Sequence, residues 1–128
     1  MQARPDPRRR TARRGEDLAA RWLKLKGYLV EARNWRCALG EIDIVARDGE
    51  TLVFVEVKTR GTGAAGSPEE AVNARKQRRL VRLAQAYLAH HRLTEVPCRF
   101  DVVAVNRTGW LPRLRHIRAA FRADGPVV

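Results

Sequence analysis

Two apolar segments joined by a short turn are the strongest constraint on the fold of this chain. Residues 41–46 and 51–58 are rich in isoleucine and valine, and Asp48-Gly49 lies between them. Asp-Gly is a preferred turn pair in two-stranded antiparallel hairpins, because glycine accepts the positive φ that such turns require. The pattern therefore predicts a β-hairpin in the first half of the chain.

Helical and strand patterns on both sides of this hairpin predict an α/β domain. Residues 15–26 place apolar side chains at helical spacing and are followed by Gly27, which predicts an amphipathic helix. Residues 67–70 (Ser-Pro-Glu-Glu) have the composition of a helix start, and the helical pattern runs to about residue 91 with a break near Asn73. Strands are predicted at residues 28–34, 99–105 and 111–117, with a loop at 35–37 and a terminal turn through Phe121. The order is α-β-β-β-α-β, followed by a small appendix.

The chain is short enough for a single domain, and its charge indicates a polyanionic partner. It has 128 residues, with 26 lysines and arginines against 14 aspartates and glutamates, a formal net charge of +12. We assign residues 15–121 to the domain, residues 1–14 to a disordered basic arm and residues 122–128 to a C-terminal tail. A surplus of this size favours nucleic acid over an anionic membrane as the partner.

Other features of the composition exclude several classes of protein. No apolar run approaches the ~20 residues of a membrane span, and no apolar segment follows the basic N-terminal residues as in a secretory signal. Cys37 and Cys98 form no CxxC pair and have no histidine at ligand spacing. These facts argue against a structural zinc site and a disulfide scaffold, and the expected compartment is the cytoplasm.

Two carboxylates occupy positions where strands rarely carry them. Asp43 and Glu56 each lie inside an apolar strand, where an uncompensated carboxylate is costly to desolvate. Because side chains alternate along a strand, Glu56 and Lys58 point to the same face, which Asp43 reaches if the hairpin register permits. Clustered carboxylates beside one lysine suit a Mg²⁺ site. A salt bridge to Lys58 explains the same pattern, and the spacing alone does not separate the two interpretations.

Two further carboxylates carry both a functional and a structural interpretation. Glu16 borders the buried stripe of the first predicted helix, so it is a candidate member of the same site. A glutamate in a first turn also stabilises the helix dipole, and taken alone this is the stronger interpretation. Asp101 lies in another predicted strand, where it either joins the site or pairs with a neighbouring arginine, and we favour the pair.

The acidic positions and their surroundings resemble a known family. Asp43 followed by Glu56-Val57-Lys58 resembles the PD-(D/E)xK signature of restriction-endonuclease-like nucleases, whose core has the same α-β-β-β-α-β order. More closely, residues 15–121 resemble the YraN-like family, a bacterial group of predicted nucleases. The segments that carry this resemblance are Gly15-Glu16, Arg33-Asn34-Trp35, Gly40-Glu41-Ile42-Asp43, Phe54-Val55-Glu56-Val57-Lys58, Lys76-Gln77 and Arg99-Phe100-Asp101-Val102.

The resemblance implies a restriction-endonuclease-like fold with a nuclease-like site. Asp43 and Glu56 would ligate Mg²⁺, or Mn²⁺ in its place, and the Val57 carbonyl would add a ligand. Glu16 would complete or orient the site from the first helix. Lys58 would position or help to deprotonate the attacking water and stabilise the charge that builds on the phosphate. The candidate catalytic set is therefore Glu16, Asp43, Glu56 and Lys58.

Basic side chains supply candidates for binding the nucleic-acid backbone. Four arginines share one face of the predicted helix that ends near residue 91: Arg75, Arg78, Arg79 and Arg82. A solvated helix face is the alternative interpretation, but no acidic residue lies between positions 71 and 94 to pair with them. Lys76 and Gln77 border the apolar stripe of the same helix and approach the candidate site. Trp35, next to Arg36, is a candidate for stacking on a base.

These observations predict a Mg²⁺-dependent endonuclease, with DNA favoured over RNA as its substrate. Action on branched or junction structures is inferred by analogy with resolvases of the same superfamily. A catalytically silent nucleic-acid-binding module of the same fold is the alternative, and a basic scaffold for an acidic protein explains the strand carboxylates poorly. Cleavage of two strands would favour a homodimer, although no feature of the sequence specifies one.

Overall fold

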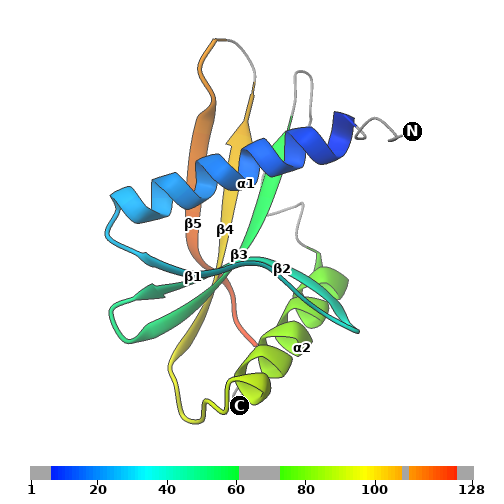
Figure 1. The fold of residues 1–128 in the computed structure, drawn as a ribbon, viewed down its shortest axis with the longest axis vertical. Helices are drawn as coiled ribbons and strands as arrows, with labels where there is room; N and C mark the ends of the chain where they lie inside the picture. The colour runs from blue at the N-terminus through cyan, green and yellow to red at the C-terminus, as the bar shows by residue number, and fades with distance from the viewer. Residues whose placement is uncertain (1–6, 61–72, 108–109, 124–128) are drawn as a thin grey trace, which may run out of the picture.

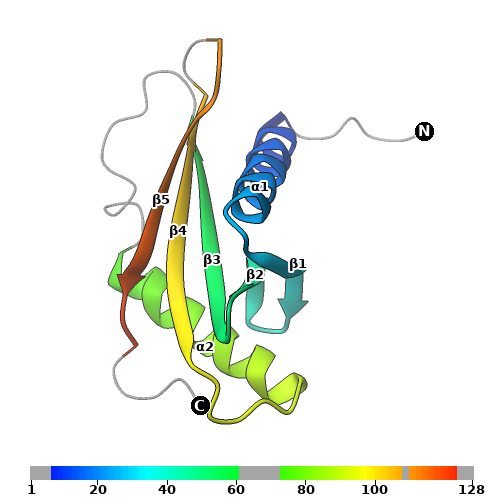
Figure 2. The ribbon, with the colours of Figure 1, turned by 90° about the vertical axis from the view of Figure 1, so that its left-hand side faces the viewer.

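A five-stranded mixed β-sheet with one helix on each face forms the protein (Figures 1 and 2). This computed structural model describes residues 7–60, 73–107 and 110–123. The elements are α1 (Pro7–Leu25), β1 (Leu29–Cys37), β2 (Gly40–Asp48), β3 (Thr51–Arg60), α2 (Ala74–His90), β4 (Cys98–Asn106) and β5 (Arg113–Phe121). The strand order is β1-β2-β3-β4-β5, with β3 and β4 parallel and the other neighbours antiparallel. The predicted α/β architecture and the α-β-β-β-α-β order are confirmed.

The predicted hairpin is present as β2 and β3. Asp48 pairs with Thr51, so Gly49 and Glu50 form the two-residue loop, and Gly49 has a φ of 61°. The register of the pair runs from the turn to Ile44 and Val55. Beyond this point β2 remains paired with β1 but not with β3. The two strands therefore diverge at the positions next to Asp43 and Glu56.

The core consists of two clusters, one on each face of the sheet. The cluster under α1 contains Val53 and Val55 of β3, whereas the cluster under α2 contains Leu52 and Phe54. Alternate side chains of one strand thus pack against opposite helices, and all four are fully buried. A strand covered on both faces needs apolar residues at every position, which explains the continuous apolar run in this part of the sequence.

Several predicted boundaries differ from the structure. The helix α1 begins at Pro7, so residues 7–14 are helical and not part of a disordered arm. The predicted loop at 35–37 belongs to β1, because these residues continue the ladder with β2 as far as Gly40. The last strand runs from Arg113 to Phe121, so the predicted terminal turn is part of β5.

The helix start predicted at residues 67–70 lies outside the described residues. The predicted break near Asn73 coincides with the start of α2, which the Asn73 side chain caps by accepting a hydrogen bond from the backbone N–H of Lys76. Among the helices of the described segments, none is long and apolar enough to cross a membrane.

Asp101 is fully buried and structural in its contacts. The predicted pairing with an arginine is confirmed, because Arg99 Nε lies 2.9 Å from Asp101 Oδ1. His116 Nε2 lies 2.7 Å from the other oxygen, and the backbone N–H of Ala119 also donates to the carboxylate. Burial alone would raise the pKa of Asp101, but the bonds from His116 and Arg99 outweigh it and hold this pKa below its usual value.

Candidate functional site

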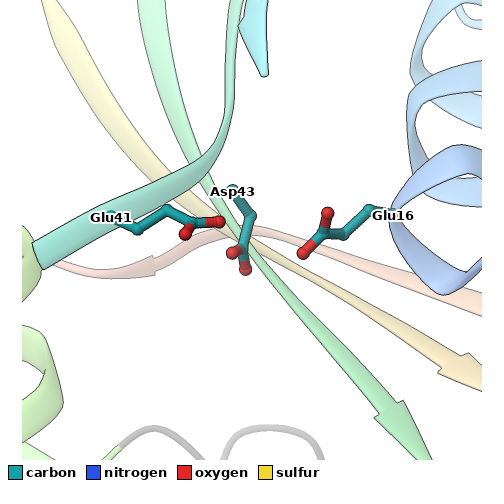
Figure 3. Close-up of side chains that lie close together, drawn as sticks. All are labelled: Glu16, Glu41 and Asp43. Atoms are coloured by element: carbon teal, nitrogen blue, oxygen red, sulfur yellow. The ribbon is translucent and has the colours of Figure 1, made fainter. Parts of the chain in front are cut away.

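Three carboxylates from two elements, α1 and β2, converge where β2 and β3 diverge. Glu16 comes from α1, while Glu41 and Asp43 come from β2. One oxygen from each of these side chains lies within 4.8 Å of the other two, and Figure 3 shows all three carboxylates directed into the same space. Carboxylate oxygens at this spacing match the ligands that hard divalent cations prefer in proteins.

Asp43 is the central member of this cluster. The backbone N–H of Val57 donates to Asp43 Oδ2 at 2.8 Å, which attaches the carboxylate to β3. The pKa of Asp43 is raised to about 8, first by burial and second by the negative charge of Glu56. Glu16 and Glu41 act in the same direction, and only the bond from Val57 opposes them. Burial and the neighbouring carboxylates therefore both disfavour the ionised form of Asp43, and a bound cation would favour it.

Glu56 and Lys58 form a direct ion pair beside Asp43. Lys58 Nζ lies 3.1 Å from Glu56 Oε1, and both side chains are largely buried, with exposed fractions of 21% and 17%. The expected placement of these two residues on one face is thus correct. The salt bridge to Lys58 is therefore confirmed, the carboxylate cluster lies next to it, and the Mg²⁺ site stays a prediction.

One open pocket of about 530 Å³ contains the whole predicted catalytic set. Its walls include Glu16, Asp43, Glu56 and Lys58, together with Val57 and Thr59 of β3. The N-terminal half of α1 closes one side with Arg8, Thr11 and Ala12. Residues far apart in the sequence are therefore brought to one concave surface of suitable size for a small charged group.

Two residues with no role predicted from the sequence, Asn34 and Glu41, lie in the site. The Asn34 amide donates to Glu16 Oε2 at 2.9 Å and to Glu41 Oε1 at 2.7 Å. Asn34 adopts a φ of 52°, a conformation that asparagine tolerates better than most residues. Glu41 had one usable signal, because it precedes Asp43 by two positions on the same strand. Asn34 had a signal of another kind, because it lies in the segment Arg33-Asn34-Trp35 that carries the family resemblance. Its contacts depend on the local backbone conformation, which that segment does not reveal.

The position of Glu16 depends on a close approach between α1 and β3. A Cβ atom on Gly15 would lie 1.9 Å from Thr59 Oγ1 and 3.0 Å from Thr59 Cβ. Only glycine allows this contact, which explains a glycine inside a long helix despite its low helix propensity. The approach brings the next residue, Glu16, to the place where β2 and β3 diverge and the strand carboxylates lie.

The arginine face predicted on α2 lies beside the pocket. Its four arginines are exposed and line a groove of about 540 Å³ with Leu39, Asn73 and Lys76: Arg75, Arg78, Arg79 and Arg82. A hydrogen bond and charge repulsion between Lys76 and Lys58 lower the pKa of Lys76. This contact joins the groove, which we call the α2 groove, to the carboxylate pocket.

The remaining predicted nucleic-acid contacts are distributed around these two features. Gln77 lies in a neighbouring depression with Arg78 and Arg82. Arg36 is exposed, and its Nε lies 3.0 Å from Glu41 Oε2 at the margin of the cluster. Trp35 does not line the pocket, because its ring packs edge-on against Tyr87 at 5.3 Å between β1 and α2. A base-stacking role for Trp35 stays a prediction.

Comparison with known sequences identifies one family. The model of the uncharacterised protein family UPF0102 matches residues 15–105. A UPF0102 protein of Anaeromyxobacter dehalogenans is 48% identical over 120 residues, covering 94% of this chain and 90% of the relative. A UPF0102 protein of Beutenbergia cavernae is 55% identical over 105 residues, covering 81% and 89%. The matched region includes all the carboxylates of the pocket and Lys58.

Proposed function

This chain belongs to the uncharacterised protein family UPF0102, as its resemblance to the YraN-like family predicted, and we propose that it is a metal-dependent endonuclease. The substrate class is nucleic acid, with DNA as the first candidate, and the reaction is hydrolysis of a phosphodiester bond. The observation that carries this proposal is the convergence of Glu16, Asp43, Glu56 and Lys58 in one pocket.

The residues of the pocket fit a divalent cation such as Mg²⁺ or Mn²⁺. Glu16, Glu41 and Asp43 all offer carboxylate oxygens, and one oxygen of each lies close enough to the others to share one ion. The predicted ligand pair was Asp43 with Glu56. The geometry supports Asp43 and adds Glu16 and Glu41, while Glu56 stands beside them in its pair with Lys58. A bound cation lowers the pKa of a coordinated water and offsets negative charge on a phosphate.

Lys58 is the group in the pocket best suited to act on the reacting phosphate. Its ammonium is held by Glu56 and opens onto the same pocket as the carboxylates. A fixed positive charge in a partly buried site stabilises the extra negative charge of a pentacoordinate phosphorus. The same ammonium positions a water molecule between itself and the carboxylate cluster for attack on the phosphorus.

The α2 groove supports nucleic acid as the substrate. Exposed arginines bind phosphate oxygens of the backbone without reading the sequence of bases. The groove reaches the pocket through Lys76 and Lys58, so a strand bound in the groove can continue across the carboxylates. The net charge of +12 favours the same class of ligand.

A cleavage assay tests this proposal directly. Duplex, single-stranded, flap and four-way DNA, and matched RNA, are incubated with Mg²⁺ or Mn²⁺ and the wild-type protein. We expect cleavage of at least one substrate, with a preference for branched DNA, and loss of about 10²-fold or more in rate for Lys58→Ala and Glu56→Ala. Lys24→Ala and Glu50→Ala, at exposed positions outside the pocket, serve as matched controls and should cleave as wild type does.

Binding measured in EDTA separates this proposal from its alternative. Under the nuclease proposal, Lys58→Ala keeps most of its DNA affinity because the α2 groove is intact. If the wild type binds DNA but cleaves none of the substrates with either metal, the protein is a catalytically silent binding module. Cleavage by Lys58→Ala at the wild-type rate would remove Lys58 from the mechanism.

A further inference from the structure

The N-terminal half of α1 carries a dense set of positive charges. Residues 8–14, which we call the α1 arginine segment, contain five exposed arginines: Arg8, Arg9, Arg10, Arg13 and Arg14. Glu16 is the first acidic residue of the helix. In Figure 1 this end of α1 reaches past β3, whereas the C-terminal half of the helix covers the sheet. The segment lies on the opposite face of the sheet from α2, because the two helices pack on different core clusters.

The charges of this segment are unfavourable for an isolated helix. The first turn of α1 has no acidic residue, although the positive end of the helix dipole favours negative charge there. Arginines at positions 9 and 13, and at 10 and 14, are four residues apart and repel each other. Within the described segments no carboxylate pairs with any of these four arginines. A polyanion would supply the missing negative charge.

The segment leads directly to the carboxylate pocket. Arg9, Arg13 and Glu16 follow one another at i, i+4 and i+7, so they share one side of the helix. Arg8 and Thr11 line the pocket that contains Asp43, Glu56 and Lys58. A phosphate chain bound along α1 would therefore enter the pocket from the side opposite the α2 groove.

We propose that the α1 arginine segment is a second surface that binds the backbone of duplex nucleic acid. This inference rests on the proposed function for its class of ligand. Arg9 and Arg13 lie on adjacent turns, about 6 Å apart along the helix axis. This distance is close to the ~7 Å, measured along the DNA axis, between one phosphate and the second phosphate after it on the same strand. An anionic membrane fits less well, because Ala12 is the only apolar residue of the segment and a membrane-surface helix needs a broad apolar face.

The salt dependence of DNA binding tests this surface. The affinity for a short DNA duplex is measured in EDTA at several salt concentrations for wild type and Arg9→Gln/Arg13→Gln. We expect the negative slope of log affinity against log salt to become less steep by about 2, because each lost phosphate contact reduces its magnitude by ~0.9. Arg21→Gln/Lys24→Gln removes the same charge from exposed positions in the other half of α1, and its slope should stay within about 0.5 of wild type.

Further measurements decide what an altered slope means. Circular dichroism of each variant shows whether α1 has been retained, and Arg10→Gln/Arg14→Gln, with the same spacing, shows which side of the helix carries the contact. Equal slopes for Arg9→Gln/Arg13→Gln and the matched control would overturn this inference, as would binding to anionic vesicles in preference to DNA. EDTA prevents metal-dependent cleavage, so this binding measurement remains valid even if the protein is not a nuclease. If the protein cleaves DNA but Arg9→Gln/Arg13→Gln and its matched control have equal slopes, only the proposed α1 surface is refuted.

Discussion

Substituting Gly15 by alanine would raise the helix propensity of α1 but create a steric clash where α1 contacts β3. Inside a helix, alanine is more favourable than glycine by about 1 kcal/mol, so an exposed site would gain stability. Here the new Cβ atom would lie 1.9 Å from Thr59 Oγ1, 3.0 Å from Thr59 Cβ and 3.1 Å from Thr59 Cγ2. Rotation of the Thr59 side chain moves the outer atoms but not its Cβ, and the β-branched side chain has few alternatives. The helix must therefore move away from the strand.

The clash outweighs the gain in helix propensity. Adding a methyl group to a well-packed interface costs about 1–3 kcal/mol, and the 1.9 Å approach puts this position in the upper part of that range, at about 2–3 kcal/mol. Subtracting the propensity gain of about 1 kcal/mol leaves a net loss of about 1–2 kcal/mol in the free energy of unfolding. A displaced α1 also moves Glu16 away from Asp43. Gly15→Ala should thus weaken Mg²⁺ binding as well as stability, although residue 15 carries no ligand.

Urea denaturation of a double-mutant cycle measures this contact. Gly15→Ala, Thr59→Ala and the double variant are compared with wild type at pH 7 without divalent cations. Because Thr59→Ala removes Oγ1 and Cγ2, the double variant should recover about 1 kcal/mol or more relative to the sum of the single changes. If Gly15→Ala instead raises the free energy of unfolding by about 1 kcal/mol, as at an exposed helix position, α1 does not approach Thr59 and the account of Glu16 given above is wrong.

Three further predictions concern the polar residues. The pKa of Asp101 is lowered in the folded state, so its carboxylate stabilises the fold above the unfolded-state pKa of about 4, and this stabilisation is lost as the pH falls through the folded-state pKa. Asp101→Asn should therefore lower the free energy of unfolding by about 3 kcal/mol at pH 7 and by less near pH 3, as measured by urea denaturation. The pKa of Asp43 is raised to about 8, so the metal-free wild type should lose stability as the pH rises from about 4 to 8. Asp43→Asn should consequently be more stable than wild type by about 2 kcal/mol at pH 9, less than the full shift implies because the side chain is partly exposed; equal stability at pH 5 and 9 would contradict this. Asn34→Ala should weaken Mg²⁺ binding by about tenfold in a calorimetric titration, whereas an unchanged affinity would show that Asn34 does not orient Glu16 and Glu41.

Much of the sheet follows from local patterns. The β2–β3 hairpin was predictable because Gly49 permits the turn and the apolar residues on both sides have strand propensity. The common face of Glu56 and Lys58 was predictable because side chains alternate in every strand. The arginine face of α2 followed in the same way from helical periodicity. These features depend on neighbours a few residues away, which the sequence displays directly.

The errors arose where packing between distant segments determined the result. The arginines at 8–14 suggested a disordered arm, yet α1 begins at Pro7 because its later residues, such as Leu23, are buried on the sheet and helix formation propagates from them. Trp35 was expected in a loop, whereas it belongs to β1 and packs on Tyr87 of α2. Neither contact leaves a periodic signal in the neighbouring sequence.

The candidate site shows the same division. The sequence alone identified the chemical groups of the site, namely carboxylates and a lysine on strands that would otherwise be apolar. It also identified the side of β3 that carries Glu56 and Lys58. Only the tertiary structure decided which carboxylates meet, because the divergence of β2 from β3 and the close approach at Gly15 bring Glu16 and Glu41 to Asp43. The physical reason is range: dihedral preferences and side-chain alternation act over a few residues, whereas the meeting of α1 with β2 depends on burial of a core shared by the whole domain.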